Sequence, residues 1–353
     1  MMPTIKSLAS GALRVFARLL TFGLPALALM SAMAGSAREV PSFRPAQLSA
    51  GTLRIWGTPY MSEVVKAWAE GFRKLHPEIT VEMKLMGSNT AIPGLYGGQA
   101  DVALMGREPN VTDVNGFFRP KRYKFTRFQL MNGSLMTAGK SPALAVLVSR
   151  GNPIRKITIA QLHAIATCSQ KAQHRPITWG QLGVKGKWSN KPIRLYLPDI
   201  ESGTGLFFLK VVTGGSHKLN WGKVVDFKDV RRADGSTYRA FEQTANALRN
   251  DPYGIAIASL HEVTPKLKPI AVAAKDGGPF VLPSRDTVTA HTYPFARSTF
   301  AFIDRPPGKP IDPKVREFLR YVLSNEGQAA IKRDQGYLPL SRKMVTEQRN
   351  RLN

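Results

Sequence analysis

Three segments of the chain share one local order: a strand, a turn with hydroxyl or amide side chains, and the start of a helix. They span residues 53–60, 79–90 and 193–205. Because strands that alternate with helices are typical of α/β proteins, this order predicts an α/β fold. Its sheets are expected to be mostly parallel and flanked by helices.

Further pieces of the same kind lie between and after these segments. Residues 143–148 are continuously apolar, as in a central strand that is covered on both faces. Apolar residues recur on one face of the predicted helix that ends at Leu75, and Thr58 followed by Pro59 is typical of a helix start. The other predicted elements are strands at 101–105 and 254–258 and helices that include 158–162 and 318–323.

Each of the three turns places a polar side chain where a helix begins: Thr58, Ser88 and Ser202. Backbone N–H groups are free at such positions and the helix dipole favours negative charge, so a helix N-terminus can bind an anion. Taken one by one, such residues are more often ordinary helix caps. If the three turns meet in one cleft, they predict a site for a tetrahedral oxyanion.

The first 37 residues have the pattern of a secretory signal. Lys6, Arg14 and Arg18 precede an apolar run at 19–30, and small residues follow it up to Ala37. The run is shorter than the roughly 20 residues that a spanning helix needs, although an uncleaved N-terminal anchor is the alternative. We therefore expect export to the periplasm, where a single cysteine, Cys168, leaves the fold without an internal disulfide.

The chain is strongly basic, with 50 Lys and Arg against 24 Asp and Glu and a net charge of +26. Such a field concentrates anions near a protein and can steer them into a cleft. A generally basic surface without any role in binding is the alternative. Basic and aromatic residues interleave at 119–128, but we interpret this stretch as a connector and expect no nucleic-acid partner.

Other chemistry finds little support in the sequence. The six histidines show no metal-ligand spacing, and no nucleophile elbow of the Gly-x-Ser-x-Gly type is present. The segment 183–188 lacks the spacing and the hydroxyl residue of a phosphate loop. We therefore expect no catalytic residues, no metal site and no cofactor.

Short motifs follow one another in a fixed order over most of the chain. In this order they resemble those of the phosphate-binding substrate-binding proteins of ABC transporters, which are type II periplasmic binding proteins. Each motif alone is weak, but their shared order over residues 52–341 is specific. The motifs lie at 57–60, 87–90, 100–107, 177–183, 201–204, 293–297, 318–324, 327–328 and 336–339.

The resemblance implies a two-lobed periplasmic-binding-protein-like fold with the ligand cleft between the lobes. It also implies a discontinuous first lobe, because the chain crosses to the second lobe and later returns. The expected divisions are a signal peptide at 1–37, a leader at 38–51, lobe 1 at 52–142 plus 290–341, lobe 2 at 143–289, and a basic tail at 342–353 that frays.

By the same resemblance the protein is a receptor that captures phosphate or a similar tetrahedral oxyanion and delivers it, as a monomer, to an ABC permease in the inner membrane. The alternative is an envelope interaction or sensing protein of the same fold with a degenerate ligand site. The residues expected to bind ligand are Thr58, Tyr60 (through its backbone N–H), Ser88, Asn89, Thr90, Arg107, Ser202, Gly203 and Thr204.

Three positions depart from the pattern of the family. Gly106 stands where an Asp or Ser is common, Pro198 where an Arg is common, and Glu201 where a Gly is usual. Without an acidic acceptor at 106, the site is expected to distinguish poorly between phosphate and a fully ionised oxyanion such as sulfate. Glu201 is a candidate replacement for that acceptor, the alternative being a side chain that faces solvent, and Arg107 is a candidate for the missing positive charge.

Overall fold

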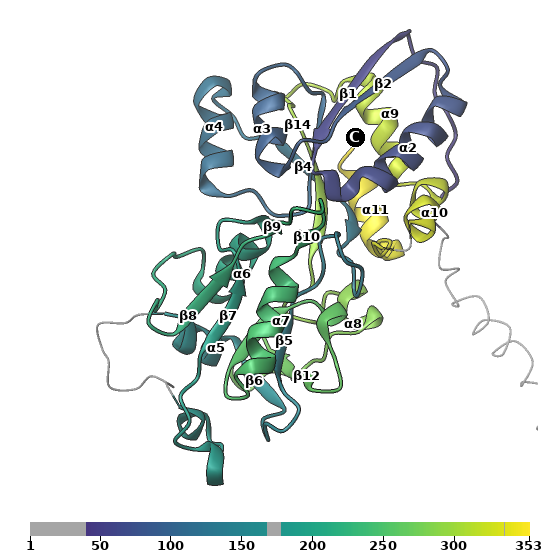
Figure 1. The fold of residues 1–353 in the computed structure, drawn as a ribbon. Coiled ribbons are helices and arrows are strands. Elements are labelled where there is room, and N and C mark those ends of the chain that lie inside the picture. Colours follow the sequence, from purple (N-terminus) through teal and green to yellow (C-terminus); the bar gives the residue numbers. More distant parts are fainter. Residues whose placement is uncertain (1–39, 168–177, 335) are drawn as a thin grey trace, which may run out of the picture. The chain divides into compact units, whose positions relative to one another are not determined.

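The computed structural model describes residues 40–167, 178–334 and 336–353 (Figure 1). The expected signal at 1–37 and Cys168 therefore lie outside the described residues. The described part of the chain forms two five-stranded sheets, each packed between helices. We call the first sheet with its helices the first lobe and the second sheet with its helices the second lobe.

The first sheet has the strand order β2-β1-β3-β14-β4. Its strands are β1 (Gly51–Gly57), β2 (Ile79–Lys84), β3 (Val102–Met105), β4 (Thr126–Asn132) and β14 (Ser298–Ile303). The helices of this lobe are α2 (Ser62–Leu75), α3 (Ser88–Tyr96), α4 (Val111–Lys121), α9 (Pro313–Val322), α10 (Asn325–Arg333) and α11 (Arg342–Asn350).

Alternating side chains of this sheet enter two separate cores. In β3, Val102 and Leu104 pack with residues of α2, α9, α10 and α11, whereas Ala103 and Met105 pack with residues of α3 and α4. This follows from the strand geometry, because successive side chains point to opposite faces. The sheet is therefore covered on both faces, and only the ends of its strands and the adjoining turns are available for a site.

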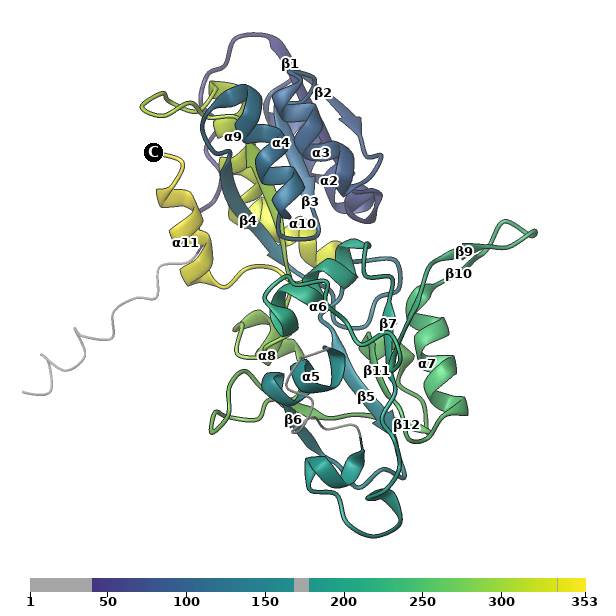
Figure 2. The same cartoon turned by 90° about the vertical axis from the view of Figure 1, so that its left-hand side faces the viewer.

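The second sheet has the order β12-β5-β11-β7-β8. Its strands are β5 (Ala145–Ser149), β7 (Leu195–Pro198), β8 (Val224–Phe227), β11 (Ile255–Ala258) and β12 (Leu267–Pro269). Its helices are α5 (Ile159–Ala166), α6 (Gly203–Thr213), α7 (Ala240–Asn250) and α8 (Arg285–Thr289), with α5, α6 and α8 on one side and α7 on the other (Figure 2). The buried strand β5 lies between two neighbours, which confirms the central strand predicted at 143–148.

Short elements complete the second lobe. Two strand pairs are β6 (Lys156–Thr158) with β13 (Ala271–Ala273), and β9 (Val230–Arg231) with β10 (Thr237–Tyr238). The second pair forms a hairpin that stands out from the lobe beside α7 (Figure 2). Single 3-10 turns are η2 (Pro59–Met61), η4 (Trp179–Leu182), η5 (Gly186–Trp188) and η6 (Leu260–Glu262).

The two-lobed α/β architecture is as predicted, but the sheets are mixed. Within them four strand pairings are parallel and four are antiparallel. In each sheet a single strand, β14 in the first and β5 in the second, runs against its neighbours. These are the strands by which the chain passes from one sheet to the other, so no helical crossover constrains them to be parallel.

The expectation that the C-terminal tail frays is wrong. Residues 342–350 form α11, which is capped by Ser341, and Val345 and Leu352 are buried in the core of the first lobe. The polar and basic composition of the tail conceals these two apolar positions. Val345 lies in the helix and Leu352 follows its end, and both pack into the same core.

The predicted return to the first lobe at residue 290 is too early. Tyr293 and Phe295 are buried in the core of the second lobe, and the Tyr293 hydroxyl donates to the carbonyl of Leu144 at 2.7 Å. The connecting backbone is held by further bonds, since the N–H of Gly133 donates to the carbonyl of Arg297 at 2.7 Å. The outgoing and returning chains therefore run together between the lobes.

Among the described residues, no helix combines the length and the apolar character that crossing a membrane requires.

Candidate functional site

The N-terminus of α6 is built by Ser202. The residue is extended, with φ −70° and ψ 159°, and its Oγ accepts the N–H of Gly205 at 3.0 Å while donating to the carbonyl of Asp199 at 2.6 Å. A side chain at 205 would lie 2.2 Å from that carbonyl oxygen, so this tight turn requires glycine. Because the first N–H groups of a helix have no partner within it, those of Gly203 and Thr204 point outward from this end.

Thr58 holds the corresponding turn after β1. It is buried, its N–H donates to the carbonyl of Leu104 at 3.1 Å, and its Oγ1 accepts the N–H of Tyr60 at 3.4 Å. Pro59 follows at the start of η2, so the predicted helix start at Thr58 and Pro59 is confirmed. The backbone N–H of Tyr60, expected to face a ligand, is held by Thr58 in this structure.

The third turn precedes α3, whose first residue is Ser88. Gly87 caps the helix in a backbone conformation with φ +131° that favours glycine. The Oγ1 of Thr90 donates to the carbonyl of Gly87 at 2.9 Å, which turns this side chain back onto its own helix. Ser88 therefore stays available at the tip of the turn, whereas Thr90 does not.

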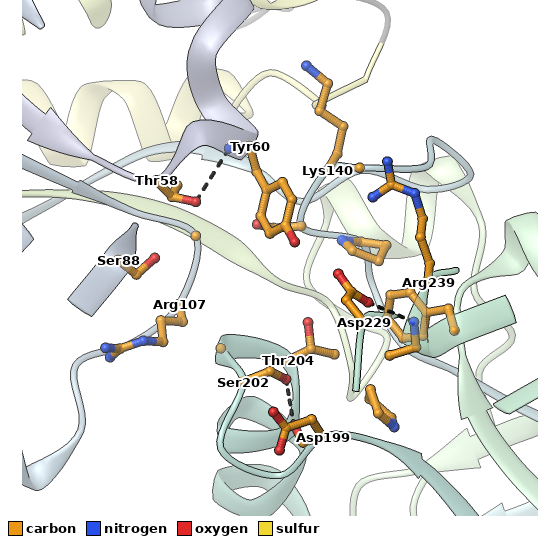
Figure 3. A pocket seen from close by; sticks show the side chains of 18 of the residues that line it. Thr58, Tyr60, Ser88, Arg107, Lys140, Asp199, Ser202, Thr204, Asp229 and Arg239 are labelled. Carbon is orange, nitrogen blue, oxygen red and sulfur yellow. Dashed lines mark hydrogen bonds between the residues drawn. The ribbon is translucent and has the colours of Figure 1, made fainter. Parts of the chain in front are cut away.

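One cavity of about 440 Å³ brings these turns together (Figure 3). Its lining includes residues that follow β1 and β3 in the first lobe and residues that follow β7, β8 and β11 in the second. Thr90 is not among the lining residues, and its hydroxyl is bonded to Gly87 instead. The eight other residues expected to bind ligand do line the cavity: Thr58, Tyr60, Ser88, Asn89, Arg107, Ser202, Gly203 and Thr204.

The guanidinium group of Arg107 is already paired. One of its nitrogens bonds the carboxylate of Asp113, and Nη2 donates to Oδ1 of Asn89 at 2.8 Å. In Figure 3 this head group points away from Ser202 and Thr204. The expectation that Arg107 supplies free positive charge is therefore wrong, since Asp113 neutralises it within the first lobe.

A second arginine, Arg297, lies at the start of α6. It is 3% exposed, and its guanidinium donates to Oγ1 of Thr204 at 3.0 Å and to the carbonyl of Gly106 at 2.6 Å. Its Nε atom is buried without a partner, and Arg297 forms no ion pair with any described carboxylate. Burial lowers the pKa of Arg297 to about 10, so the group is still charged at neutral pH.

Sequence reasoning did not identify Arg297 as a site residue. It lies 93 positions from Thr204, and its place just before β14 resembles that of any residue entering a strand. The motif at 293–297 is the only signal in the sequence that draws attention to it. Five further charged residues of the lining were also missed: Lys140, Asp199, Asp229, Arg239 and Glu262.

Glu201, considered as a replacement acceptor, is a lining residue of the cavity whose side chain is largely exposed. Its side chain is 67% exposed and lies 3.5 Å from Nδ1 of His217 at the outer side of the turn. Pro198, the last residue of β7, is buried and adds no polar atom of a side chain. No group of three or more His, Cys, Asp or Glu side chains in the described part of the chain is placed to hold a metal ion.

A family model described as the PBP superfamily domain matches residues 44–326. The chain belongs to the PBP superfamily. The predicted kinship with binding proteins of this kind is thereby confirmed, and the matched region includes every residue of the cavity.

Two relatives within this superfamily cover most of the chain. The phosphate-binding protein PstS of Pseudomonas aeruginosa is 29% identical over 92% of this chain and 94% of its own length. Protein SphX of Synechococcus elongatus is 27% identical over 82% of this chain and 78% of its own length.

Solved structures share the fold at lower identity. An ABC-type phosphate transport receptor from Vibrio cholerae has a TM-score of 0.55 and 19% identity, and covers 81% of this chain and 99% of its own. PstS from Borrelia burgdorferi has a TM-score of 0.55 and 16% identity, with coverage of 82% and 99%. At these identities the likeness supports the fold alone.

Proposed function

We propose that the protein is an exported receptor that binds phosphate or a similar tetrahedral oxyanion between its lobes and delivers it to an ABC permease in the inner membrane. We expect it to act as a monomer in the periplasm and to catalyse no reaction. Relatives named as phosphate-binding proteins support this proposal, as does the position of the cavity at the turns that precede helices.

The observation that carries the proposal is the meeting of Arg297 with the N-terminus of α6 at one cavity. A buried cation without a carboxylate is costly unless an anion compensates it. The outward N–H groups of Gly203 and Thr204 and the hydroxyls of Thr58 and Ser88 surround the same space. An oxyanion in this space would therefore find both a charged hydrogen-bond donor, the guanidinium group, and neutral donors, the N–H and hydroxyl groups.

Arg297 also explains how binding would involve both lobes. It contacts Gly106, which follows β3 of the first lobe, and Thr204 of α6 in the second. We expect an anion at this point to favour closure of the lobes, because closure brings donors from both sides onto it. Small-angle scattering should then show a smaller radius of gyration with phosphate than without it.

The test is calorimetric titration of the ligand-free protein with phosphate, sulfate and molybdate. We expect Arg297→Lys to weaken phosphate binding by about tenfold or more, because lysine cannot keep several planar bonds at once. Arg150→Lys is the matched control, since Arg150 donates to the carbonyls of Pro265 and Leu267 far from the cavity. Equal affinities for the two variants would remove Arg297 from the site.

The alternative, a protein of the same fold with a degenerate site, is favoured by one observation. The charge of Arg107 is neutralised by Asp113, so the first lobe brings less positive charge to the cavity than expected. The same titration decides between the two functions. A folded protein that binds none of the three oxyanions would support the alternative.

A further inference from the structure

The cavity lining carries as many acidic as basic side chains, although the whole chain has a net charge of +26. Two of the basic groups are paired with carboxylates outside the lining, Arg107 with Asp113 and Lys140 with Asp334. A site for a bare dianion gains nothing from carboxylates, since like charges repel. The acidic lining residues are Asp199, Glu201, Asp229 and Glu262, and the basic ones are Arg107, Lys140, Arg239 and Arg297.

The acidic groups of interest lie apart from the predicted anion end. In Figure 3, Ser88 is on one side of the cavity and Asp229 and Arg239 are on the other, with Tyr60 between them. Burial raises the pKa of the Tyr60 phenol, and the nearby carboxylate of Asp229 raises it further. The cavity thus has two ends of different chemistry, joined by an aromatic ring.

Asp229 and Glu262 are placed to receive a cation. Asp229 lies between β8 and the β9–β10 hairpin, where its Oδ1 accepts the N–H of Ala240 at 2.7 Å. Glu262 lies in η6, and burial raises its pKa above the ordinary range. Arg239, Arg249 and His261 act on Glu262 through space, but none of the ion pairs of the described residues includes Asp229 or Glu262. A positively charged group in the cavity would compensate both carboxylates.

The volume agrees with a ligand larger than a single oxyanion. A water molecule takes about 30 Å³ in the liquid, so an oxyanion of five non-hydrogen atoms takes roughly 150 Å³ and leaves most of the cavity of about 440 Å³ unfilled before the lobes close. Cavities of roughly 300–1,000 Å³ are typical of sites for organic molecules.

We propose that the cavity binds a small zwitterion that joins a phosphate or phosphonate group to a protonated amine. The phosphorus group would lie at the N-terminus of α6 and Arg297, and the amine would face Asp229 and Glu262. This inference rests on the proposed function, because it uses the same anion end. It adds that the ligand carries a protonated amine as well as the phosphorus group, whereas a receptor for inorganic phosphate alone would need no site for an amine.

The experiment titrates the refolded, ligand-free protein with three compounds by calorimetry. O-Phosphoethanolamine carries both groups, ethyl phosphate has a similar length without the amine, and inorganic phosphate has the anion alone. We expect O-phosphoethanolamine to bind about tenfold or more tightly than either of the others. 2-Aminoethylphosphonate, tested in parallel, shows whether the ester oxygen matters.

Asp229→Asn is the variant that tests the amine end. An amide oxygen at 229 can still accept the N–H of Ala240, so the turn is expected to persist. The preference for O-phosphoethanolamine over ethyl phosphate should fall to about twofold or less. Asp276→Asn removes the same charge from an exposed position of the second lobe and should keep the preference. Glu262→Gln is the second variant, should Asp229→Asn fail to fold.

The outcomes separate the two proposals. If inorganic phosphate binds and the amine brings no advantage, the zwitterion is excluded while the oxyanion receptor stands. If Asp229→Asn and Glu262→Gln both keep the full preference, the amine does not contact these carboxylates and the inference is wrong. If none of the compounds binds to the folded protein, the proposed function itself fails.

Discussion

The hydroxyl oxygen of Ser141 lies 2.1 Å from the position that a Cβ atom on Gly106 would occupy. Both residues line the cavity, and Ser141 is buried. A larger residue at 106 would therefore have to displace Ser141. The space that a side chain at 106 would take is filled here by a hydroxyl, which can both donate and accept a hydrogen bond.

Selectivity between oxyanions should be weak for this reason. A hydroxyl can bond a protonated phosphate or a fully ionised sulfate, whereas a carboxylate would repel the latter. We expect phosphate and sulfate affinities to differ by about tenfold or less in competition titrations at neutral pH. A preference of several orders of magnitude would show that another acceptor acts. Glu201→Gln, at an exposed position, is the control and should leave the ratio unchanged.

Restoring an acidic residue at 106 should require a second change. We expect Gly106→Asp to lower the free energy of unfolding by about 1–3 kcal/mol, because it forces an additional side chain into a filled space. The double variant Gly106→Asp with Ser141→Gly should recover much of that loss in urea unfolding experiments. If the single variant is as stable as the parent protein, the packing around Ser141 adapts more easily than the structure indicates.

Ser202→Ala should weaken both the helix start and anion binding. Removing an N-cap costs about 0.5–2 kcal/mol of stability, and a disordered first turn loses the outward N–H groups of Gly203 and Thr204. We expect phosphate affinity to fall about tenfold in calorimetry. Ser341→Ala removes the equivalent cap of α11, remote from the cavity, and should reduce stability alone. Similar affinities for the two variants would exclude Ser202 from the site.

His291 should make the protein less stable in mild acid. Its Nε2 lies 2.6 Å from Oδ1 of Asn132, and burial lowers its pKa below the ordinary value of 6.5. The unfolded chain therefore takes up a proton near pH 6.5 while the folded protein does not, so the contribution of His291 is complete above this pH and is lost as the pH falls. Its neighbours Gln129, Asn132 and Ser298 are uncharged.

Urea unfolding at several pH values between about 5 and 7 tests this, because that interval spans the ordinary histidine pKa. His291→Asn should flatten the dependence of stability on pH, and asparagine tolerates the positive φ of 55° at this position. His217→Asn replaces an exposed histidine and should leave the dependence unchanged. An equally steep dependence in both variants would assign the effect to other groups.

The part of the site that sequence predicts is the part made by neighbouring residues. Thr58 and Ser202 were predicted as helix caps, and each accepts a backbone N–H two or three positions further on. The role of Arg297 depends on partners 93 and 191 positions away, which no local pattern encodes. Arg107 was misjudged for another reason: Asp113 is only six positions away, but the sequence does not show that the two side chains pair.

The fold, too, was predicted where it depends on neighbouring residues and was missed where it depends on distant segments. Continuous apolar runs predicted the buried strand at β5, but not the direction of β14, because direction depends on which lobe the chain arrives from. At the C-terminus, the basic and polar composition of the tail led to a prediction that it frays, although Val345 and Leu352 are core residues. Position in a filled core, rather than composition, decides whether a terminal helix stays folded.

The variant Leu352→Ala tests how much the packing of the C-terminal residues contributes to the free energy of unfolding. Its side chain is 3% exposed in the core of the first lobe, so its truncation should cost about 2–5 kcal/mol in urea unfolding. Leu282→Ala, at a leucine that is 52% exposed, should change stability by about 0.5 kcal/mol or less. A negligible effect at 352 would mean that the tail frays in solution after all.

The strand β14 lies between β3 and β4 in the sheet, yet in the sequence it follows both of them by more than 160 residues. The second sheet uses only residues 145–269 and has all its strands as soon as this stretch is available. During synthesis, which runs from the N-terminus, β3 and β4 therefore each keep an unpaired edge until β14 is available. The lobe whose residues emerge first is the last to close its sheet, and until residue 303 arrives it is the part of the molecule most open to aggregation.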